Sequence, residues 1–167
     1  MPLIQALTTT RRTALLAALT LAMTGCATTS TPINLTDSLA AQPALSTFVD
    51  LANKAGLAET LKSSGPYTVF APTNDAFKAV PTATMDDLAK HPEKLKAVLN
   101  YHIIMGSATA ATIKNSDAKS LEGSNLALAK AGDFVTVESA AVVRPDLKAS
   151  NGVIHTIDTV LLPPKKK

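Results

Sequence analysis

Residues 35 to 63 carry the spacing of amphipathic helices. Apolar residues recur there at the i, i+3, i+4 and i+7 positions that share one helical face: Leu45, Phe48, Val49 and Ala52. Gly56 follows the last of them, and glycine commonly ends a helix. The pattern predicts a helical segment up to Gly56 and a further helical turn or two after it.

A strand and a capped helix are expected next. The segment YTVFAP, residues 67–72, is apolar and rich in β-forming residues, which predicts a buried strand. Thr73 can cap a helix that has Asn74 and Asp75 in its first turn, where a negative charge meets the positive end of the helix.

Two further helix starts are predicted between residues 81 and 102. Thr84 and Asp87 have the spacing of a capping box, and Pro92 suits the first position of a helix. Four residues share one face of that last helix: Leu95, Val98, Leu99 and His102. His91, just before Pro92, is expected to be solvated.

From Ile103 onward the pattern changes to short strands separated by Gly, Asn and Asp turns. Strands are expected around Leu121, at residues 126–128, 134–138 and 142–143, and in the closing segment 152–162. Helices gathered early and strands gathered late predict an α+β domain rather than an alternating parallel sheet.

The first 25 residues have the pattern of an export signal. Arg11 and Arg12 precede an apolar run from Ala14 to Met23, which is about half the length of a membrane-spanning helix. The segment LAMTGC resembles a bacterial lipoprotein signal, in which the cysteine is acylated and becomes the mature N-terminus. Cys26 is therefore the expected lipid attachment site, and an ordinary signal peptide with an incidental thiol is the alternative.

Charge, composition and cysteine content set the limits of the domain and exclude some kinds of partner. Removing residues 1–25 leaves 14 basic and 13 acidic residues, a net charge of +1, with no basic stripe for nucleic acid. Residues 26–33 read as a tether, 34–163 as one domain and 164–167 as a basic tail. The single cysteine excludes an intramolecular disulfide.

No enzyme signature is present. The chain lacks a G-x-S-x-G elbow, an H-E-x-x-H motif, a P-loop and a dinucleotide-binding glycine pattern. Three scattered histidines without a second cysteine do not suggest a zinc site. The sequence thus predicts a protein without catalysis, metal or cofactor.

Three segments together resemble the fasciclin-type adhesion domain. They are YTVFAPTNDAF at 67–77, LNYHII at 99–104 and NGVIHTIDTVLLP at 151–163, and the similarity runs from about Asn34 to Pro163. The resemblance implies a wedge-shaped β-sandwich of about seven strands with N-terminal and flanking helices, found in surface proteins that mediate adhesion.

The resemblance also assigns roles to particular residues. It implies a structural role for five of them: Thr73, Asp75, Phe77, His155 and Asp158. Animal members use the Tyr-His segment to engage integrins, which makes Tyr101 and His102 the candidate partner-binding residues. The alternative for His102 is a buried histidine at a helix end.

His155 requires a separate argument, because a histidine beside an aspartate can also be catalytic or bind a metal. Strand alternation places His155 on the face of Val153 and Ile157 and Asp158 on the opposite face, so the two are not expected to pair. A buried, hydrogen-bonded His155 is the favoured interpretation over ligand contact or catalysis.

The expected function is that of a non-enzymatic envelope lipoprotein that binds a surface protein or glycan and promotes adhesion. It would be held by its acylated Cys26, and Ala27 in place of aspartate favours the outer membrane by resemblance to enterobacterial lipoproteins. The alternative is a periplasmic binding module for a small apolar ligand.

Overall fold

The computed structural model describes residues 33–63 and 65–164. The predicted signal peptide, Cys26 and the three terminal lysines lie outside these residues. The helices are α1 (Leu35–Ala40), the 3-10 turn η1 (Pro43–Leu45), α2 (Ser46–Lys54), α3 (Ala58–Lys62), α4 (Asn74–Ala79), α5 (Thr82–Lys90) and α6 (Pro92–Tyr101). The strands are β1 (Tyr67–Pro72), β2 (Ile103–Met105), β3 (Ser116–Lys119), β4 (Asn125–Ala131), β5 (Phe134–Val137), β6 (Ala140–Ala149) and β7 (Gly152–Ile157).

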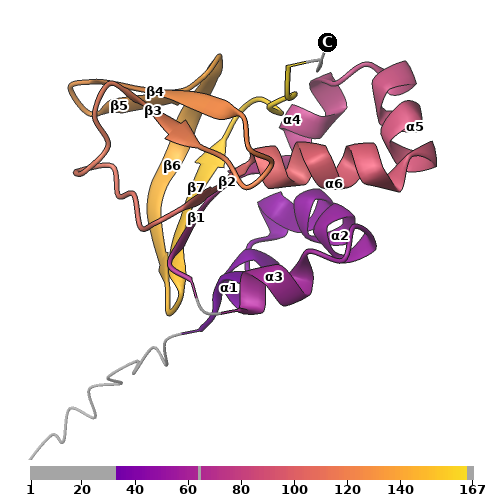
Figure 1. Ribbon diagram of the computed structural model, residues 1–167, viewed down its shortest axis with the longest axis horizontal. Coiled ribbons are helices and arrows are strands. Elements are labelled where there is room, and N and C mark those ends of the chain that lie inside the picture. The colour runs from indigo at the N-terminus through magenta and orange to yellow at the C-terminus, as the bar shows by residue number, and fades with distance from the viewer. Residues whose placement is uncertain (1–32, 64, 165–167) are drawn as a thin grey trace, which may run out of the picture.

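The seven strands form one sheet in the order β2-β1-β7-β6-β5-β4-β3. β1 and β7 run parallel, and every other neighbouring pair is antiparallel. The sheet curls so that its outer strands approach each other, and a bridge between Ile104 and Ser120 joins them into a near-barrel. Figure 1 shows the helices gathered on one side of this sheet. The structure confirms the predicted α+β class with seven strands.

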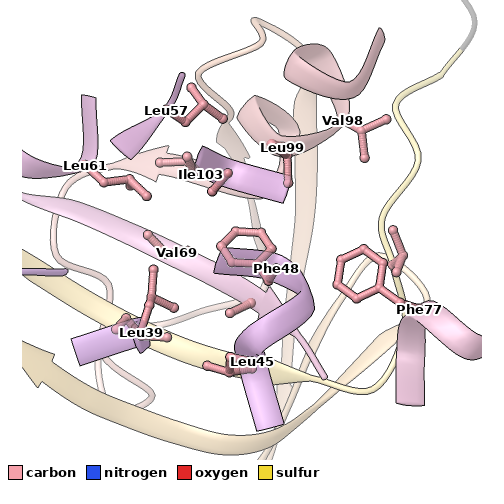
Figure 2. Close-up of a cluster of buried hydrophobic side chains, with 14 of the residues drawn as sticks. Leu39, Leu45, Phe48, Leu57, Leu61, Val69, Phe77, Val98, Leu99 and Ile103 are labelled. Atoms are coloured by element: carbon pink, nitrogen blue, oxygen red, sulfur yellow. The ribbon is translucent and has the colours of Figure 1, made fainter. Parts of the chain in front are cut away.

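β1 and β7 lie in the middle of the molecule and are buried on both faces. Val69 and Ile154 point toward the helices, where they join a core built around Phe48, Leu57 and other apolar residues (Figure 2). The opposite face points into the near-barrel, where a second core forms from Phe70, Tyr101, Ile104, Ile113, Leu126, Leu128, Val135, Val137, Ala140, Ile157 and Leu161. The two strands therefore separate the two cores.

The N-terminal helical region is more broken than the sequence predicts. Residues 35–63 contain three helices and a 3-10 turn, because Pro43 cannot continue the hydrogen bonding of α1. α2 ends at Lys54, and Gly56 follows with φ at 71°, as its predicted role at the helix end requires.

Two local predictions are wrong. α5 begins at Thr82 after Pro81, so Thr84 lies inside the helix and the capping box does not form. The strand expected around Leu121 lies earlier, at 116–119, while the Leu121 N–H bonds to the Ile103 carbonyl just beyond it. By contrast, Pro92 does begin α6.

No helix among residues 33–63 and 65–164 is long and apolar enough to cross a bilayer.

Candidate functional site

His155 lies in β7 at the centre of the sheet and is fully buried. Its Nε2–H donates to the carbonyl oxygen of Ala108 at 2.7 Å, and its Nδ1 accepts from the backbone N–H of Asp146 at 3.4 Å. The ring stacks on Phe70 with 5.5 Å between the centroids. Both ring nitrogens therefore have partners inside the protein.

Burial lowers the pKa of His155, while the hydrogen bond to Ala108 and the charge of Asp146 act in the opposite direction. The imidazole is thus neutral at pH 7. Its contacts assign the Nε2–H tautomer, since Nδ1 serves as an acceptor.

The loop at residues 106–115 is held by several side chains of the central strands, and His155 is one of them. Thr68 Oγ1 donates to a carbonyl of this loop at 2.7 Å. Asp146 accepts from the Ala110 N–H at 2.8 Å, and the φ of Asp146 is 58°, at an irregularity in β6. The polar groups around His155 therefore fix the 106–115 loop against the sheet.

Asp158 follows β7 and is exposed. Its Oδ1 accepts from the Ala141 N–H at 2.9 Å and from the Thr159 hydroxyl at 3.0 Å. The hydrogen bond from Ala141 ties the end of β7 to β6. His155 and Asp158 thus have different partners.

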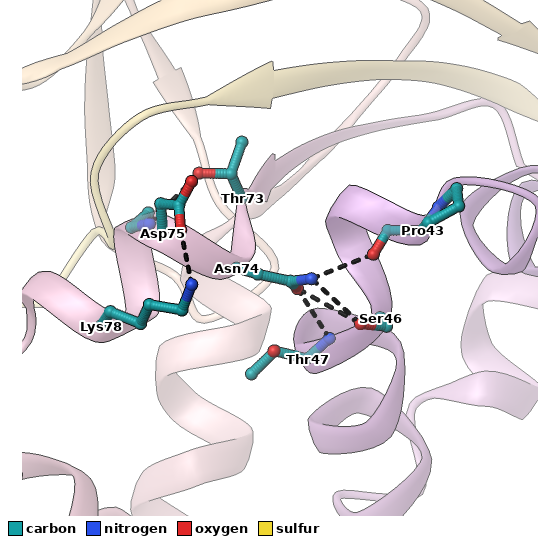
Figure 3. Close-up of polar contacts among 8 residues, drawn as sticks. Pro43, Ser46, Thr47, Thr73, Asn74, Asp75 and Lys78 are labelled. Carbon is teal, nitrogen blue, oxygen red and sulfur yellow. Dashed lines mark hydrogen bonds and ion pairs between the residues drawn. The ribbon is translucent and has the colours of Figure 1, made fainter.

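The segment after β1 joins α4 to α2 (Figure 3). Thr73 caps α4 by accepting from the Ala76 N–H at 3.1 Å, as predicted. Asp75 is exposed and pairs with Lys78 at 2.8 Å, and this hydrogen bond lowers the pKa of Asp75. Phe77 is buried in the helix-side core.

Asn74 makes the contacts between α4 and the start of α2, a role that sequence analysis did not assign to it. Its Oδ1 accepts from the Thr47 N–H at 3.0 Å, and its Nδ2 donates to the Pro43 carbonyl at 2.9 Å (Figure 3). A side chain that can donate and accept at once suits this position, because the start of α2 has no cap of its own.

Asn151 is a second structural residue that sequence analysis read only as part of a turn. Its Oδ1 accepts from the Leu35 N–H at 2.8 Å, and its Nδ2 donates to the Leu61 carbonyl at 2.7 Å and the Ser63 carbonyl at 3.1 Å. Next to it, a Cβ on Gly152 would collide with the Tyr67 carbonyl. One turn therefore joins α1, α3 and β1.

His102 caps the C-terminal end of α6 and is fully buried. Its Nδ1–H donates to the Val98 carbonyl at 2.8 Å, and its Nε2 accepts from the Leu161 N–H at 3.0 Å. Burial lowers its pKa to about 4, so the ring is neutral and gains nothing from a positive charge at the helix end. His102 thereby fixes the C-terminal segment against α6.

Tyr101 is only 3% exposed. The hydroxyl lies 3.2 Å from the Asn125 carbonyl and 3.3 Å from Oε1 of Glu138. Burial, followed by the charge and hydrogen bond of Glu138, raises the pKa of Tyr101 to about 12.

Burial bears directly on the predicted recognition role of Tyr101 and His102. A partner cannot touch the His102 ring unless the residues around it move, and little of Tyr101 is accessible. The partner-binding role of the pair stays a prediction.

Tyr101 lines a surface cavity of about 260 Å³. The other lining residues are Glu138, Ser139, Val160, Leu161 and Leu162. This cavity brings together α6, the turn between β5 and β6, and the C-terminal segment that His102 holds. It is the one place in the described structure where the predicted Tyr-His pair meets the surface.

A larger cavity of about 560 Å³ lies between α5, α6 and the C-terminal segment. Its lining is mainly apolar and includes Leu88, Val98 and Leu162. No group of three or more His, Cys, Asp or Glu side chains that could hold a metal ion occurs in the described part of the chain.

The surroundings of the three histidines do not suit acid–base chemistry. All three histidines of the sequence lie in the described residues. Two of them are buried and use both ring nitrogens internally. His91 is half-exposed and lies beside Asp87 and Glu93, as expected for a solvated position between two helices. None of the three is oriented toward a nucleophile in a cavity.

Comparison with known proteins gives one consistent family. The model of the fasciclin domain matches residues 43–163. A protein of Synechocystis sp. designated sll1483 is 41% identical over 140 residues, which cover 83% of this chain and 78% of that protein. The cell surface glycolipoprotein MPB83 of Mycobacterium bovis is 40% identical over 108 residues, covering 65% of this chain and 48% of that protein.

Solved structures agree at the level of the fold. This chain superimposes on about half of the structure of a FAS1 domain pair from the insect cell adhesion molecule fasciclin I, with a TM-score of 0.63 and 18% sequence identity. The match covers 78% of this chain and 51% of that one.

Proposed function

Because this chain belongs to the fasciclin domain family, we propose that it is a non-enzymatic lipoprotein of the bacterial envelope whose domain binds a protein or glycan on another surface and so promotes adhesion. The observation that carries the proposal is the family match over residues 43–163. A relative that is 40% identical is named as a cell surface glycolipoprotein, which supports a similar location for this protein.

The anchor in this proposal is the acylated Cys26. The expected tether, residues 26–33, would connect it to the folded domain. Two or more acyl chains give stable membrane attachment, whereas a single chain gives only marginal binding. Cys26→Ser should therefore release the protein from the membrane fraction. Retention of the Cys26→Ser variant in that fraction would contradict lipid anchoring without bearing on the adhesive role of the domain.

Gene deletion tests the adhesive role itself. Attachment of intact cells to abiotic, bacterial and host surfaces is scored for the wild type, the deletion strain and the complemented strain. The proposal expects attachment to fall on deletion and to return on complementation. Unchanged attachment to all three surfaces would overturn it.

The alternative is a periplasmic binding module for a small apolar ligand. The apolar cavity of about 560 Å³ beside α5 and α6 supports it, since ligand pockets commonly measure roughly 300–1,000 Å³. Native mass spectrometry of the protein purified from its host would show a bound small molecule. Protection from external protease in intact cells would favour this module, and cleavage would favour the adhesive function.

A further inference from the structure

The cavity at Tyr101 contains a carboxylate with one oxygen held in place and the other free. Glu138 Oε1 accepts from the Ala127 N–H at 2.9 Å and lies 3.3 Å from the Tyr101 hydroxyl. Glu138 Oε2 makes no hydrogen bond or ion pair with any residue of the described structure. The side chain is exposed and can offer this oxygen to a ligand.

The backbone at Glu138 is also unusual. Its φ is 55°, in the left-handed region that costs a residue other than glycine of the order of 1 kcal/mol. Asn or Gly commonly occupies such a position in a two-residue hairpin turn. The turn therefore carries a carboxylate at the edge of the cavity. Asn or Gly, which would fit this backbone with less strain, has no carboxylate.

The electrostatic environment of the cavity is negative. Glu138 is the one charged residue among those that line the cavity, and its carboxylate lies 3.3 Å from the Tyr101 hydroxyl. No cation of the described residues pairs with Glu138. A positively charged group is therefore the ligand that this cavity would attract.

The other wall of the cavity is apolar. Leu162 is 51% exposed there, and the adjacent Leu161 is held by its N–H bond to His102 Nε2. The cavity, at about 260 Å³, is below the range of roughly 300–1,000 Å³ that is typical for whole small ligands. Its size suits a single side chain that has an apolar stem and a charged head.

We propose that this cavity binds an arginine side chain of a partner protein, with the guanidinium on Glu138 and the methylene stem against Leu162. Arginine fits better than lysine because its planar group donates several hydrogen bonds in fixed directions and is more weakly hydrated. In this proposal Tyr101 orients Glu138, and His102 holds the segment that carries Leu162. Tyr101 and His102 thus contribute in different ways. The inference rests on the proposed binding function.

The test uses 15N-labelled full-length protein and the probe N-acetyl-arginine amide. N-acetyl-citrulline amide, which has the same shape without the charge, is the matched control ligand. Titration should shift the backbone amides of Ala127 and Ser139 with the arginine probe, and citrulline should bind about fivefold more weakly or worse. Equal binding of the two probes would overturn the proposal.

Variants locate the binding site. Glu138→Gln keeps an oxygen for the Ala127 N–H but removes the charge, so affinity for the arginine probe should fall about fivefold. Leu162→Ser, at an exposed position, should also weaken binding. Glu93→Gln, at an exposed carboxylate on α6, should leave it unchanged. An unaltered affinity in a folded Glu138→Gln protein would exclude this site.

A chain ending at Pro164 tests whether the three terminal lysines fill the cavity instead. If the arginine probe binds only after their removal, the occupant is this chain's own tail and the proposal fails. Attachment assays separate the two hypotheses. If gene deletion abolishes attachment and Glu138→Gln does not, the arginine site alone is wrong. If deletion has no effect, the adhesive function itself is wrong.

Discussion

His155 and His102 are both buried and neutral, and each donates one hydrogen bond and accepts another. Their tautomers are opposite: His155 carries its proton on Nε2, and His102 carries its proton on Nδ1. Around His155 every polar partner is an internal backbone group of the sheet or the 106–115 loop. Around His102 the accepted hydrogen bond fixes a segment that lines a surface cavity.

The difference shows how one residue type can serve two purposes in one domain. We refer to β1, β7, Asn151 and His155 as the spine, and to Tyr101, His102, Glu138 and Leu162 as the rim. The spine uses its polar groups internally. The rim leaves a carboxylate oxygen and an apolar side chain exposed. Changes in the spine should therefore act on stability alone, whereas changes in the rim should also alter binding.

The largest effect is expected in the spine at Gly152. A Cβ there collides with the Tyr67 carbonyl, and backbone in the centre of a sheet has little room to move. Gly152→Ala should lower the free energy of unfolding by more than about 3 kcal/mol, measured by urea denaturation. Ser150→Ala, an exposed neighbour, should change it by less than about 0.5 kcal/mol. A fully stable Gly152→Ala protein would contradict the close approach of the two strands.

His155→Ala should have the next largest effect. It leaves a cavity beside Phe70 and removes the partners of the Ala108 carbonyl and the Asp146 N–H, at a cost of about 3 kcal/mol. Attachment per folded molecule should not change. A His155→Ala variant with an unchanged melting temperature and abolished attachment would place binding in the spine.

Acid should destabilise the protein through its buried histidines. The pKa of His102 is lowered to about 4, against about 6.5 in an unfolded chain, so the unfolded state takes up a proton first as the pH falls. The stabilisation is complete above pH 6.5 and decreases between pH 6.5 and 4. Between pH 7.5 and 5, His102 should account for a loss of about 2 kcal/mol. The lowered pKa of His155 adds a loss in the same direction.

Denaturation curves across this pH range check the prediction. His102→Gln should flatten the pH dependence, although its stability at pH 7.5 is lower. The prediction is wrong if His102→Gln retains the full acid sensitivity.

The smallest stability effect is expected for Tyr101→Phe in the rim. Loss of the hydroxyl should cost about 1 kcal/mol, since its single proton is shared between the Asn125 carbonyl and Glu138. Attachment should nevertheless decrease, because Glu138 is no longer oriented. Tyr67→Phe is the matched control and should leave attachment intact. Equal attachment by both variants would show that the Tyr101 hydroxyl has no part in binding.

Sequence reasoning located the main elements where the pattern was local. Thr73 as a cap, Pro92 as a helix start and the α+β order of elements all follow from a few neighbouring residues. The predicted capping box at Thr84 does not form. Pro81 occupies the N-cap position of α5, three residues before the position that the motif assigns to Thr84. Local motifs compete, and a sequence does not show which one prevails.

The hydrogen bonds of Asn151 and His102 could not be predicted, because their partners are distant in sequence. Asn151 bonds to Leu35, 116 residues away, and His102 bonds to Leu161, 59 residues away. Asn74 and Asn151 did offer a signal, because both lie inside the matched segments. An amide side chain can donate and accept at once, which suits a residue that joins two elements. Glu138 lay outside all three segments and gave no such signal.

The parallel pairing of β1 with β7 also sets the order in which the domain can form. β7 is the last strand of the described residues, yet it occupies the middle of the sheet, between β1 and β6. Until Ile157 has been synthesised, β1 and β6 each lack a partner strand on one side. The strand that separates the two cores is then incomplete. The sheet can therefore close only after the last of its strands has been synthesised, so this domain depends on a pairing between distant parts of the chain.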